Sequence, residues 1–152
     1  MLFIFDLDGT TFNSTHRLGN GTLADWQKNA TPENIANDSL LPLGNAWRDI
    51  APSSHPIVVM TARVMADADY NFLINNGLRA DFIYSRPEGS TLADGILKRN
   101  FLISLKRDIK KSLAWIRSHA IMFDDNADVR YTMRNELIRA YDPARYNASH
   151  TA

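Results

Sequence analysis

Short apolar runs recur along the chain and alternate with longer segments of helical periodicity. Five runs dominated by apolar residues each predict a largely buried strand; they span residues 1–5, 56–60, 81–84, 120–123 and 137–141. Apolar residues at helical spacing predict helices over residues 65–76, 91–105, 109–117 and 127–135. Because strands alternate with helices, we expect an α/β fold: a three-layer Rossmann-like sandwich around a mostly parallel sheet.

Two of the predicted helices carry boundary signals. Asn76 and Gly77 suit the left-handed conformation that ends many helices, so the helix that follows residue 65 is expected to end there. Thr91 and Asp94 have the spacing of a capping box, which predicts that the next helix opens at Thr91. The segment after Asp142 is polar and is expected to be loose.

Residues 12–54 form a polar segment rich in turn-forming residues, and we interpret it as a small insert or cap within a single domain of residues 1–152. Short amphipathic pieces lie at residues 23–28 and 41–50, and the segment is expected to lean over the strand ends. A long surface connection is the alternative. Trp26 and Trp47 could stack on a nucleobase, but anchoring of the insert to the core is the favoured interpretation.

Composition narrows the class of protein without naming a partner. The 152 residues are 45% hydrophobic and 22% charged, which is ordinary for one globular domain. Basic and acidic residues balance at 17 each, so no overall field indicates a nucleic acid or a membrane. The chain has no cysteine, no signal-peptide pattern and no apolar run of the roughly 20 residues that a membrane helix needs. We therefore expect a cytoplasmic protein with no membrane and no obligate protein partner.

Reactive polar groups follow three of the predicted strands. They are Asp6 and Asp8, Thr61 and Arg63, and Asp124 and Asp125. The carboxyl ends of parallel strands meet at one edge of a sheet, where open α/β sheets bind ligands. For the first pair alone, a polar loop after an edge strand is the alternative, but three such strand ends in one short domain favour a functional crevice.

Four carboxylates in one crevice repel each other unless a cation or a shared proton relieves them. Oxygen ligands with neither cysteine nor a histidine cluster favour a hard cation, and Mg²⁺ leaves room for a phosphate. This combination suits phosphoryl transfer, in which the charge of the phosphoryl group must be neutralised. One aspartate can act as the nucleophile, and a second carboxylate can act as the acid and base.

The ordered set Asp6-Leu7-Asp8-Gly9-Thr10, Thr61, Lys98 and Asp124-Asp125 resembles the four motifs of the haloacid dehalogenase (HAD) superfamily of phosphatases. The resemblance reaches from residue 1 to about residue 142. It implies that Asp6 is the nucleophile, that Asp8 is the acid/base, and that Thr61 and Lys98 act on the phosphate. It also implies that Mg²⁺ is held by Asp6, the main-chain carbonyl of Asp8, and Asp124 or Asp125.

Within this superfamily, the sequence is most similar to the phosphatase domain of bacteriophage polynucleotide kinase/3′-phosphatases. The similarity lies in residues 58–63, 86–98 and 123–125, in Arg17, and in the pair Asp25-Trp26. The chain departs from that pattern because it has no kinase domain or nucleotide-binding P-loop and because its insert around residues 19–45 is longer. These departures leave the substrate open more than the reaction.

Four further residues receive roles in the expected site. Lys98 is preferred over Lys106 because Asp94 lies one turn earlier and could orient its ammonium group, which makes Asp94 a supporting residue. Arg63 at a helix start makes most sense beside a bound phosphate, because helix N-termini attract anions. Arg17 and Arg86 are the other candidates for substrate contact, and surface positions are the alternative for each.

The sequence therefore predicts a Mg²⁺-dependent phosphomonoesterase with an aspartyl-phosphate intermediate, acting on a nucleotide or a polynucleotide 3′-phosphate. A small-molecule phosphatase such as a 5′(3′)-deoxyribonucleotidase is the alternative enzyme. A receiver-like module, or one that binds metal and phosphate without catalysis, is the non-enzymatic alternative. The order of motifs is against a receiver, because here the acidic pair comes last.

Overall fold

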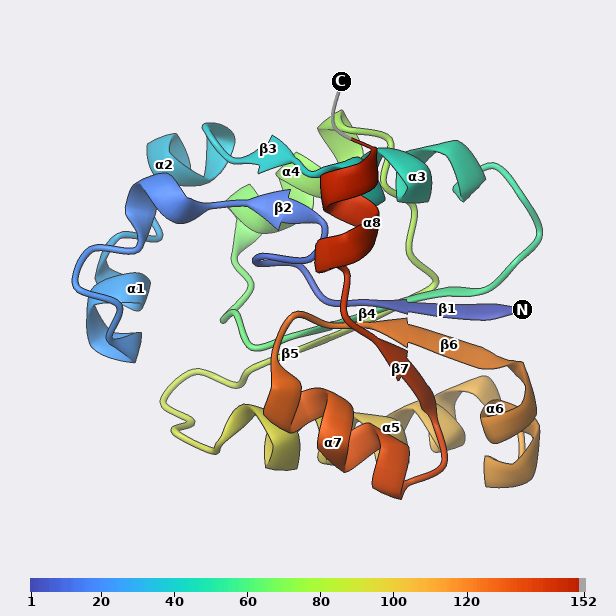
Figure 1. The fold of residues 1–152 in the computed structure, drawn as a ribbon. Coiled ribbons are helices and arrows are strands. Elements are labelled where there is room, and N and C mark those ends of the chain that lie inside the picture. The colour runs from blue at the N-terminus through green and yellow to red at the C-terminus, as the bar shows by residue number, and fades with distance from the viewer. Residues whose placement is uncertain (151–152) are drawn as a thin grey trace.

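A computed structural model describes residues 1–150, which fold around one parallel sheet. The sheet has five strands in the order β5-β4-β1-β6-β7, and all neighbouring strands are parallel (Figure 1). Their bounds are Leu2–Phe5 for β1, Ile57–Thr61 for β4, Phe82–Ser85 for β5, Ala120–Phe123 for β6 and Arg139–Tyr141 for β7. The predicted α/β class is confirmed, and β1 is the central strand.

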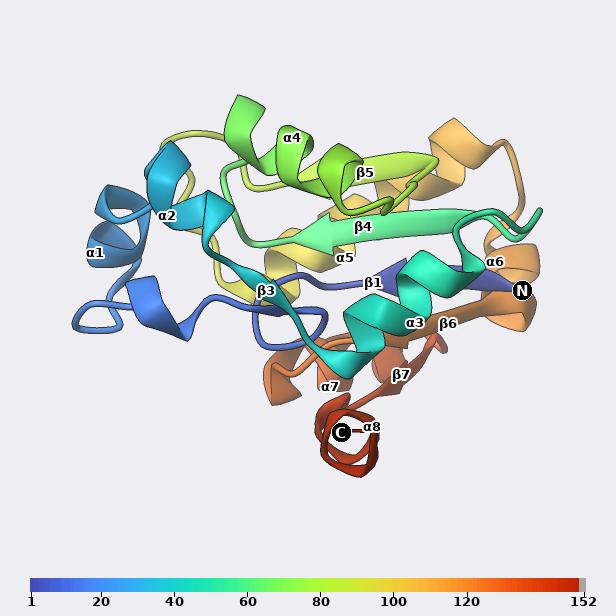
Figure 2. The same cartoon turned by 90° about the horizontal axis from the view of Figure 1, so that it is seen from above.

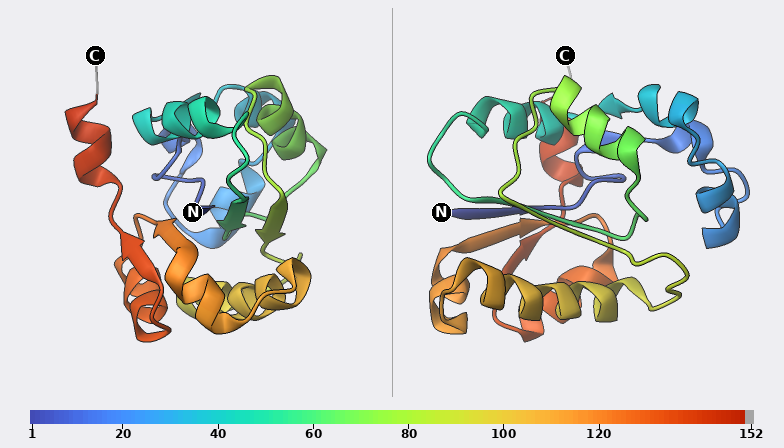
Figure 3. Two further views of the ribbon diagram at one scale, coloured as in Figure 1. Left: turned by 90° about the vertical axis from the view of Figure 1, so that its right-hand side faces the viewer. Right: turned by 180° about the vertical axis from the view of Figure 1, so that it is seen from behind.

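Helices cover both faces of the sheet and make the predicted three layers. Figures 1 and 3 show α5 (Asp94–Ile109), α6 (Leu113–His119) and α7 (Ala127–Asn135) on one face. The opposite face carries α3 (Pro42–Ile50), α4 (Asp67–Asn75) and α8 (Ala144–Ser149). Strands covered on both sides need apolar residues in succession. Accordingly, Ile4 belongs to the core beneath α5 and Phe5 to the core beneath α3.

The segment of residues 12–54 divides into two parts. Its first part contains β2 (Phe12–Asn13), the 3-10 helix η1 (Thr15–Arg17), α1 (Leu23–Lys28), α2 (Pro32–Ala36) and β3 (Ser39–Leu40). β2 and β3 pair in an antiparallel ribbon, while α1 and α2 lie beyond the carboxyl ends of the parallel strands (Figure 2). The second part is α3, which packs on the sheet. A role of the first part as a cap stays a prediction.

The two tryptophans of this segment have different environments. Trp47 on α3 is fully buried and stacks on Phe5, with 5.2 Å between the ring centroids, so it anchors the core as predicted. Trp26 on α1 is only half-buried, and α1 contributes no buried residue. The prediction of a core anchor is therefore wrong for Trp26, because α1 lies beyond the strand ends rather than on the sheet.

The largest differences from the predicted boundaries concern α5 and α6. α5 begins at Asp94 and has no side-chain cap, so the capping box at Thr91 is wrong; the Asp94 carboxylate instead binds Arg86 and Asn126. α5 also continues to Ile109, because its row of buried apolar residues continues to Leu105. The next helix, predicted from residue 109, begins only at Leu113. By contrast, α4 ends at Asn75 before Asn76 and Gly77, as expected.

The carboxyl-terminal segment is not loose over residues 144–149. It forms α8, whose Asn147 side chain donates to the carbonyl of Thr10 at 3.0 Å and accepts from the N–H of Leu43 at 2.9 Å. This long-range contact gives a polar helix a fixed place that its own sequence does not indicate. Residues 151–152 lie outside the described part of the chain. Within residues 1–150, no helix combines the length and the hydrophobicity that crossing a bilayer requires.

Candidate active site

The three predicted strand ends meet at the carboxyl edge of the sheet. Phe5 pairs with Val59 of β4 on one side and with Phe123 of β6 on the other. Asp6 extends this ladder by donating its N–H to the carbonyl of Phe123 at 3.1 Å. The groups after β1, β4 and β6 therefore lie next to one another, as the parallel sheet predicted.

An acid cluster forms where β1 and β6 end, and we define it as Asp6, Asp124, Asp125 and Lys98. One carboxylate oxygen of each aspartate lies within 4.8 Å of the others. Lys98, buried on α5, donates from Nζ to Asp6 Oδ1 at 2.8 Å and to Asp124 Oδ2 at 2.5 Å. A single ammonium group thus faces three carboxylates. The exposed Lys106 takes no part, so the choice of Lys98 matches its position.

The electrostatics of the acid cluster indicate a shortage of positive charge. Burial and the charge of Asp6 raise the pKa of Asp124 to about 7, although Lys98 opposes the shift. Partial burial of its carboxyl group and the neighbouring carboxylates likewise raise the pKa of Asp125 to about 7. Burial alone would lower the pKa of Lys98, but Asp6 and Asp124 raise it above its usual value. Lys98 therefore stays charged, and the cluster keeps an excess of carboxylates.

A divalent cation fits this arrangement. The donors are carboxylate oxygens, the set that Mg²⁺ prefers, and a cation would remove the repulsion that raises the two pKa values. Asp6, Asp124 and Asp125 are the side chains that could hold it. The Asp8 carboxylate points elsewhere and binds Arg63, so a ligand role for Asp8 through its main chain stays a prediction.

Thr10 links two members of the acid cluster. Its hydroxyl donates to Asp6 Oδ2 at 2.9 Å and accepts from the N–H of Asp125 at 3.0 Å. Gly9 precedes it with φ +75°, and a Cβ there would lie 2.3 Å from Asp125 Oδ2. Both residues belong to the Asp-x-Asp-Gly-Thr stretch, but Thr10 received no role from the motif, because the contact depends on the approach of residue 125.

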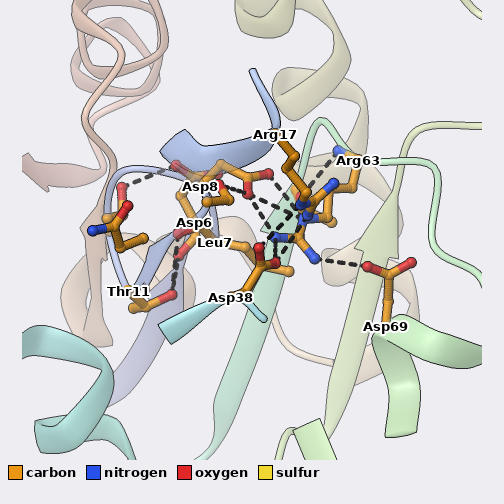
Figure 4. A network of polar contacts seen from close by, with 12 residues as sticks. Asp6, Leu7, Asp8, Thr11, Arg17, Asp38, Arg63 and Asp69 are labelled. Atoms are coloured by element: carbon orange, nitrogen blue, oxygen red, sulfur yellow. Dashed lines mark hydrogen bonds and ion pairs between the residues drawn. The ribbon is translucent and has the colours of Figure 1, made fainter. Parts of the chain in front are cut away.

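Beside the acid cluster lies an arginine hub, which we define as Arg17, Arg63, Asp8, Asp38 and Asp69 (Figure 4). Arg63 donates from Nε to Asp8 Oδ2 at 2.9 Å, from Nη1 to Asp69 Oδ1 at 2.6 Å and from Nη2 to Asp38 Oδ2 at 2.8 Å. Arg17 donates to both oxygens of Asp38, at 3.0 and 2.9 Å. The hub joins the first part of the insert to β4 and to the residues after β1.

The hub changes the expected environment of three predicted residues. Arg17 and Arg63 are only 2% and 3% exposed, and both bind carboxylates of the protein. Burial raises the pKa of Asp8, but Arg63 and a hydrogen bond from Ser14 lower it more, so the carboxyl lies below its usual range. Direct contact of either arginine with a substrate stays a prediction.

Arg86 and Asp94 support the loop between β5 and α5. The Arg86 guanidinium is buried and donates to the carbonyls of Ala62 and Leu92, and to Asp94 Oδ1 at 2.8 Å. Asp94 Oδ2 accepts from Asn126 at 3.2 Å. The prediction that Asp94 orients Lys98 is wrong, because these two partners occupy its carboxylate while Asp6 and Asp124 hold the ammonium group. Asn126 in turn donates its N–H to Asp124 Oδ1.

Thr61 ends β4 and is fully buried. Its hydroxyl oxygen accepts from the N–H of Arg63 at 3.0 Å, which fixes the turn after the strand. The position next to β1 agrees with the expected placement, while donation to a phosphate stays a prediction.

Two adjoining cavities open at this edge. The smaller, of about 310 Å³, lies over the acid cluster. The larger, of about 670 Å³, extends towards the insert and has a mostly apolar lining that includes Phe12, Leu18, Leu23, Trp26, Leu41 and Leu92. The two cavities share four lining residues, namely Asp8, Ala62, Asp94 and Asp125. Trp26, the residue that the core prediction misplaced, is thus a wall of the larger cavity.

Solved structures share this fold at low sequence identity. A haloacid dehalogenase-like family hydrolase from Streptococcus pneumoniae aligns with a TM-score of 0.63 and 13% identity over 99% of this chain and 98% of that chain. A chain of the Pnkp1/Rnl/Hen1 RNA repair complex aligns with a TM-score of 0.61 and 18% identity, over 93% of this chain and 41% of that chain. A HAD family enzyme from Bacteroides thetaiotaomicron, in complex with magnesium and inorganic phosphate, aligns at 0.52 and 10% identity over 92% of each. They confirm the HAD-like fold.

Sequence comparison is more specific. The chain is 36% identical over 87 residues to the 5′-deoxynucleotidase of Escherichia phage T5, a match that covers 51% of this chain and 36% of that protein. The matched segment thus spans about a third of the relative's length. Residues 1–149 match the family described as bacteriophage T5 5′-deoxynucleotidase, which agrees with the predicted phosphatase. The chain therefore belongs to the bacteriophage T5 5′-deoxynucleotidase family.

Proposed function

We propose that this chain is a Mg²⁺-dependent phosphomonoesterase that acts on deoxynucleoside 5′-monophosphates. The observation that carries the proposal is the continuity of the acid cluster with the larger cavity through their shared lining residues. A phosphate at the acid cluster leaves the rest of the substrate in an apolar space of the size typical for small-molecule sites. Family membership supports the choice of a deoxynucleotide.

In the proposed reaction, an oxygen of Asp6 attacks phosphorus and the bond to the ester oxygen breaks. Asp8 gives its proton to the leaving oxygen. Water then attacks phosphorus, Asp8 takes the proton from the water, and release of phosphate restores Asp6. Mg²⁺, which Asp6, Asp124 and Asp125 would hold, would supply positive charge that neutralises the phosphate.

The remaining residues are proposed to position the reacting groups and to neutralise the charge of the phosphate. Lys98, which donates to Asp6 and Asp124, is proposed to place positive charge beside the nucleophile and the phosphate. Thr61 is proposed to donate a hydrogen bond to a phosphate oxygen. Arg63 holds the Asp8 carboxylate through two nitrogens, which fixes the acid/base in one orientation. The lowered pKa of Asp8 favours its carboxylate form in the protein without substrate. This division of roles therefore requires Asp8 to take up a proton before the leaving oxygen departs.

The nucleoside is proposed to lie in the larger cavity with its base near Trp26. The lining there is apolar, with hydroxyl and amide groups of Asn13, Ser14, Thr15 and Thr22 beside it. Aromatic side chains bind any base, because every base has a π-face. We therefore expect weak discrimination between bases and stronger dependence on the presence of a base.

A nucleotide or polynucleotide 3′-phosphate is the second candidate substrate, supported by the motif similarity over residues 86–98. The decisive experiment measures phosphate release from deoxynucleoside 5′- and 3′-monophosphates, ribonucleoside 5′-monophosphates, a 3′-phosphorylated oligonucleotide and para-nitrophenyl phosphate, with Mg²⁺ and with EDTA. The proposal expects the highest kcat/KM on the deoxynucleoside 5′-monophosphates and no turnover in EDTA. A higher kcat/KM on the oligonucleotide would support the second candidate, and inactivity on all of them with Mg²⁺ would remove both.

A further inference from the structure

The arginine hub contains a buried carboxylate, Asp38, to which no sequence motif gives a role. It lies between α2 and β3, in the first part of the insert, and its side chain is fully buried. Burying a charged group is costly unless it is paired and hydrogen-bonded. Its partners therefore indicate what its burial achieves.

The first partner of Asp38 leads to the reaction centre. Asp38 Oδ2 accepts from Arg63 Nη2 at 2.8 Å, and the same nitrogen donates to Asp8 Oδ1 at 2.7 Å. One nitrogen thus joins a carboxylate of the insert to the proposed acid/base. The backbone N–H of Arg63 also binds Thr61 Oγ1. A shift of Asp38 would therefore change the direction from which Arg63 holds Asp8.

The second partner leads to the wall of the larger cavity. Arg17 binds both oxygens of Asp38, and its guanidinium carbon lies 4.2 Å from the centre of the Trp26 ring. A guanidinium at this distance is attracted to the ring and fixes it. Since α1 buries no residue in the core, Trp26 is held against the hub by this contact, with the Arg63 guanidinium carbon farther away at 5.9 Å from the ring centre.

We infer that Asp38 is a positioning residue that couples the nucleoside wall at Trp26 to the acid/base at Asp8. The inference rests on the proposed function. It makes the first part of the insert a component of the reaction: a displacement of the Trp26 wall reaches Asp8 through Arg17, Asp38 and Arg63 in succession.

Asp69 provides a matched control. It binds Arg63 Nη1 at 2.6 Å and is equally buried, but it belongs to α4 in the helical layer. Asp38 supports both arginines, whereas the contacts of Asp69 within the hub are with Arg63 alone. Asp38→Asn and Asp69→Asn each remove one carboxylate charge from Arg63, and only the former also weakens the support of Arg17.

The experiment compares Asp38→Asn, Asp69→Asn and Arg17→Met with the wild type on a deoxynucleoside 5′-monophosphate and on para-nitrophenyl phosphate, which has no nucleoside. For Asp38→Asn we expect kcat to fall roughly ten- to a hundredfold on both substrates, the range for misplaced catalytic groups. Its KM for the nucleotide is expected to rise roughly five- to tenfold, the lower range for base–aromatic stacking, with no rise for para-nitrophenyl phosphate. Asp69→Asn is expected to lower kcat without this split in KM.

Arg17→Met keeps the inference testable if Asp38→Asn does not fold. It removes the contact with Trp26 and the two hydrogen bonds to Asp38, while Asp38 keeps its bond to Arg63. It is expected to raise KM for the nucleotide alone. Equal changes of KM on both substrates in the folded variants, or a split in Asp69→Asn as large as in Asp38→Asn, would overturn the inference. If the wild type hydrolyses no deoxynucleotide, the proposed function itself has failed, which is a separate result.

Discussion

Two clusters of three aspartates lie side by side at the carboxyl edge of the sheet, and they differ in their cations. The acid cluster holds one lysine, whereas the arginine hub holds two arginines that occupy every one of its carboxylates. Asp6 and Asp8 are only two residues apart, yet they belong to different clusters. The hub nearly balances its own charge, whereas the acid cluster remains short of positive charge.

This difference in charge balance indicates which of the two clusters is expected to bind a ligand. Buried ion pairs with complete hydrogen bonding hold elements in fixed positions, whereas like charges held together raise the free energy of the folded protein. We therefore interpret the hub as the structure that fixes the insert and the acid/base. We interpret the acid cluster as a binding site, because the repulsion between its carboxylates favours the binding of a cation. The following changes test this distinction.

The largest effect is expected for Asp6→Asn, which removes the proposed nucleophile from the acid cluster. Turnover of every substrate is expected to fall on the order of 10⁴-fold or more, as in other enzymes that lose a covalent nucleophile. Thermal unfolding should stay close to that of the wild type, because the amide reduces repulsion in the cluster. Asp49→Asn, at an exposed position on α3, is the control and should retain activity. Full activity in Asp6→Asn would refute the assignment.

Breaking the hub should lower the stability of the fold in addition to its effect on activity. Arg63→Met leaves Asp8, Asp38 and Asp69 without their common partner, and loss of one member of a buried ion network destabilises by about 3–5 kcal/mol. Urea unfolding followed by circular dichroism measures this change. Arg107→Met is the control, since Arg107 pairs with Asp108 at an exposed position, and little change is expected there. Similar stabilities of the two variants would contradict the distinction between the clusters.

Mg²⁺ should stabilise the folded protein by binding to the acid cluster and not to the hub. At a concentration of a hundred times its dissociation constant, a ligand specific to the folded state adds about 2.7 kcal/mol. For a domain of this size, that amounts to a rise in Tm of roughly 5–10 °C. Asp125→Asn is expected to lose most of this rise, because it removes one of the three clustered oxygens. Asp69→Asn, in the hub, should retain it. Scanning fluorimetry with Mg²⁺ and with EDTA distinguishes the two outcomes.

The smallest change in stability is expected for the surface pair of Arg79 and Asp81. Partial burial raises the pKa of Asp81, but the N–H of Ile57 and the Arg79 guanidinium lower it more, so it lies below its usual value. A lowered pKa in the folded state means that the stabilisation is present above the unfolded value and is lost as the pH falls through the folded one. Asp81→Asn should cost less than about 1 kcal/mol at pH 7, because both groups are partly exposed.

The test for this pair is the difference in stability between Asp81→Asn and the wild type as a function of pH. The difference is expected to shrink as the pH falls below the ordinary pKa of an aspartate and to disappear once the carboxyl group is protonated in the folded state as well. A difference that grows as the pH falls would have the opposite sign to that required by a lowered pKa.

The sequence alone determined the sheet and the edge at which the site lies. Apolar runs that end in Asp6, Thr61 and Asp124 predicted strands whose parallel ends converge, and the structure places those ends together. This prediction succeeded because strand burial and chain direction are local properties, and a parallel sheet brings its strand ends to one edge whatever their order. The motifs also identified Lys98, since its residue type and order in the chain suffice for the resemblance.

Tertiary structure alone decided the partners of the charged groups. Asp38 and Asp69 carry no signal in their local sequence, and Asp94 binds Arg86 although its spacing suggested Lys98. The polar segment of α8 is ordered through Asn147, and Trp26 lies at a cavity rather than in the core. These outcomes depend on which side chains reach one another, whether they are 6 positions apart, as Arg63 and Asp69 are, or 137, as Thr10 and Asn147 are. Hydrophobic periodicity fixes which face of an element is buried, but it does not state which opposite charge will meet a given arginine.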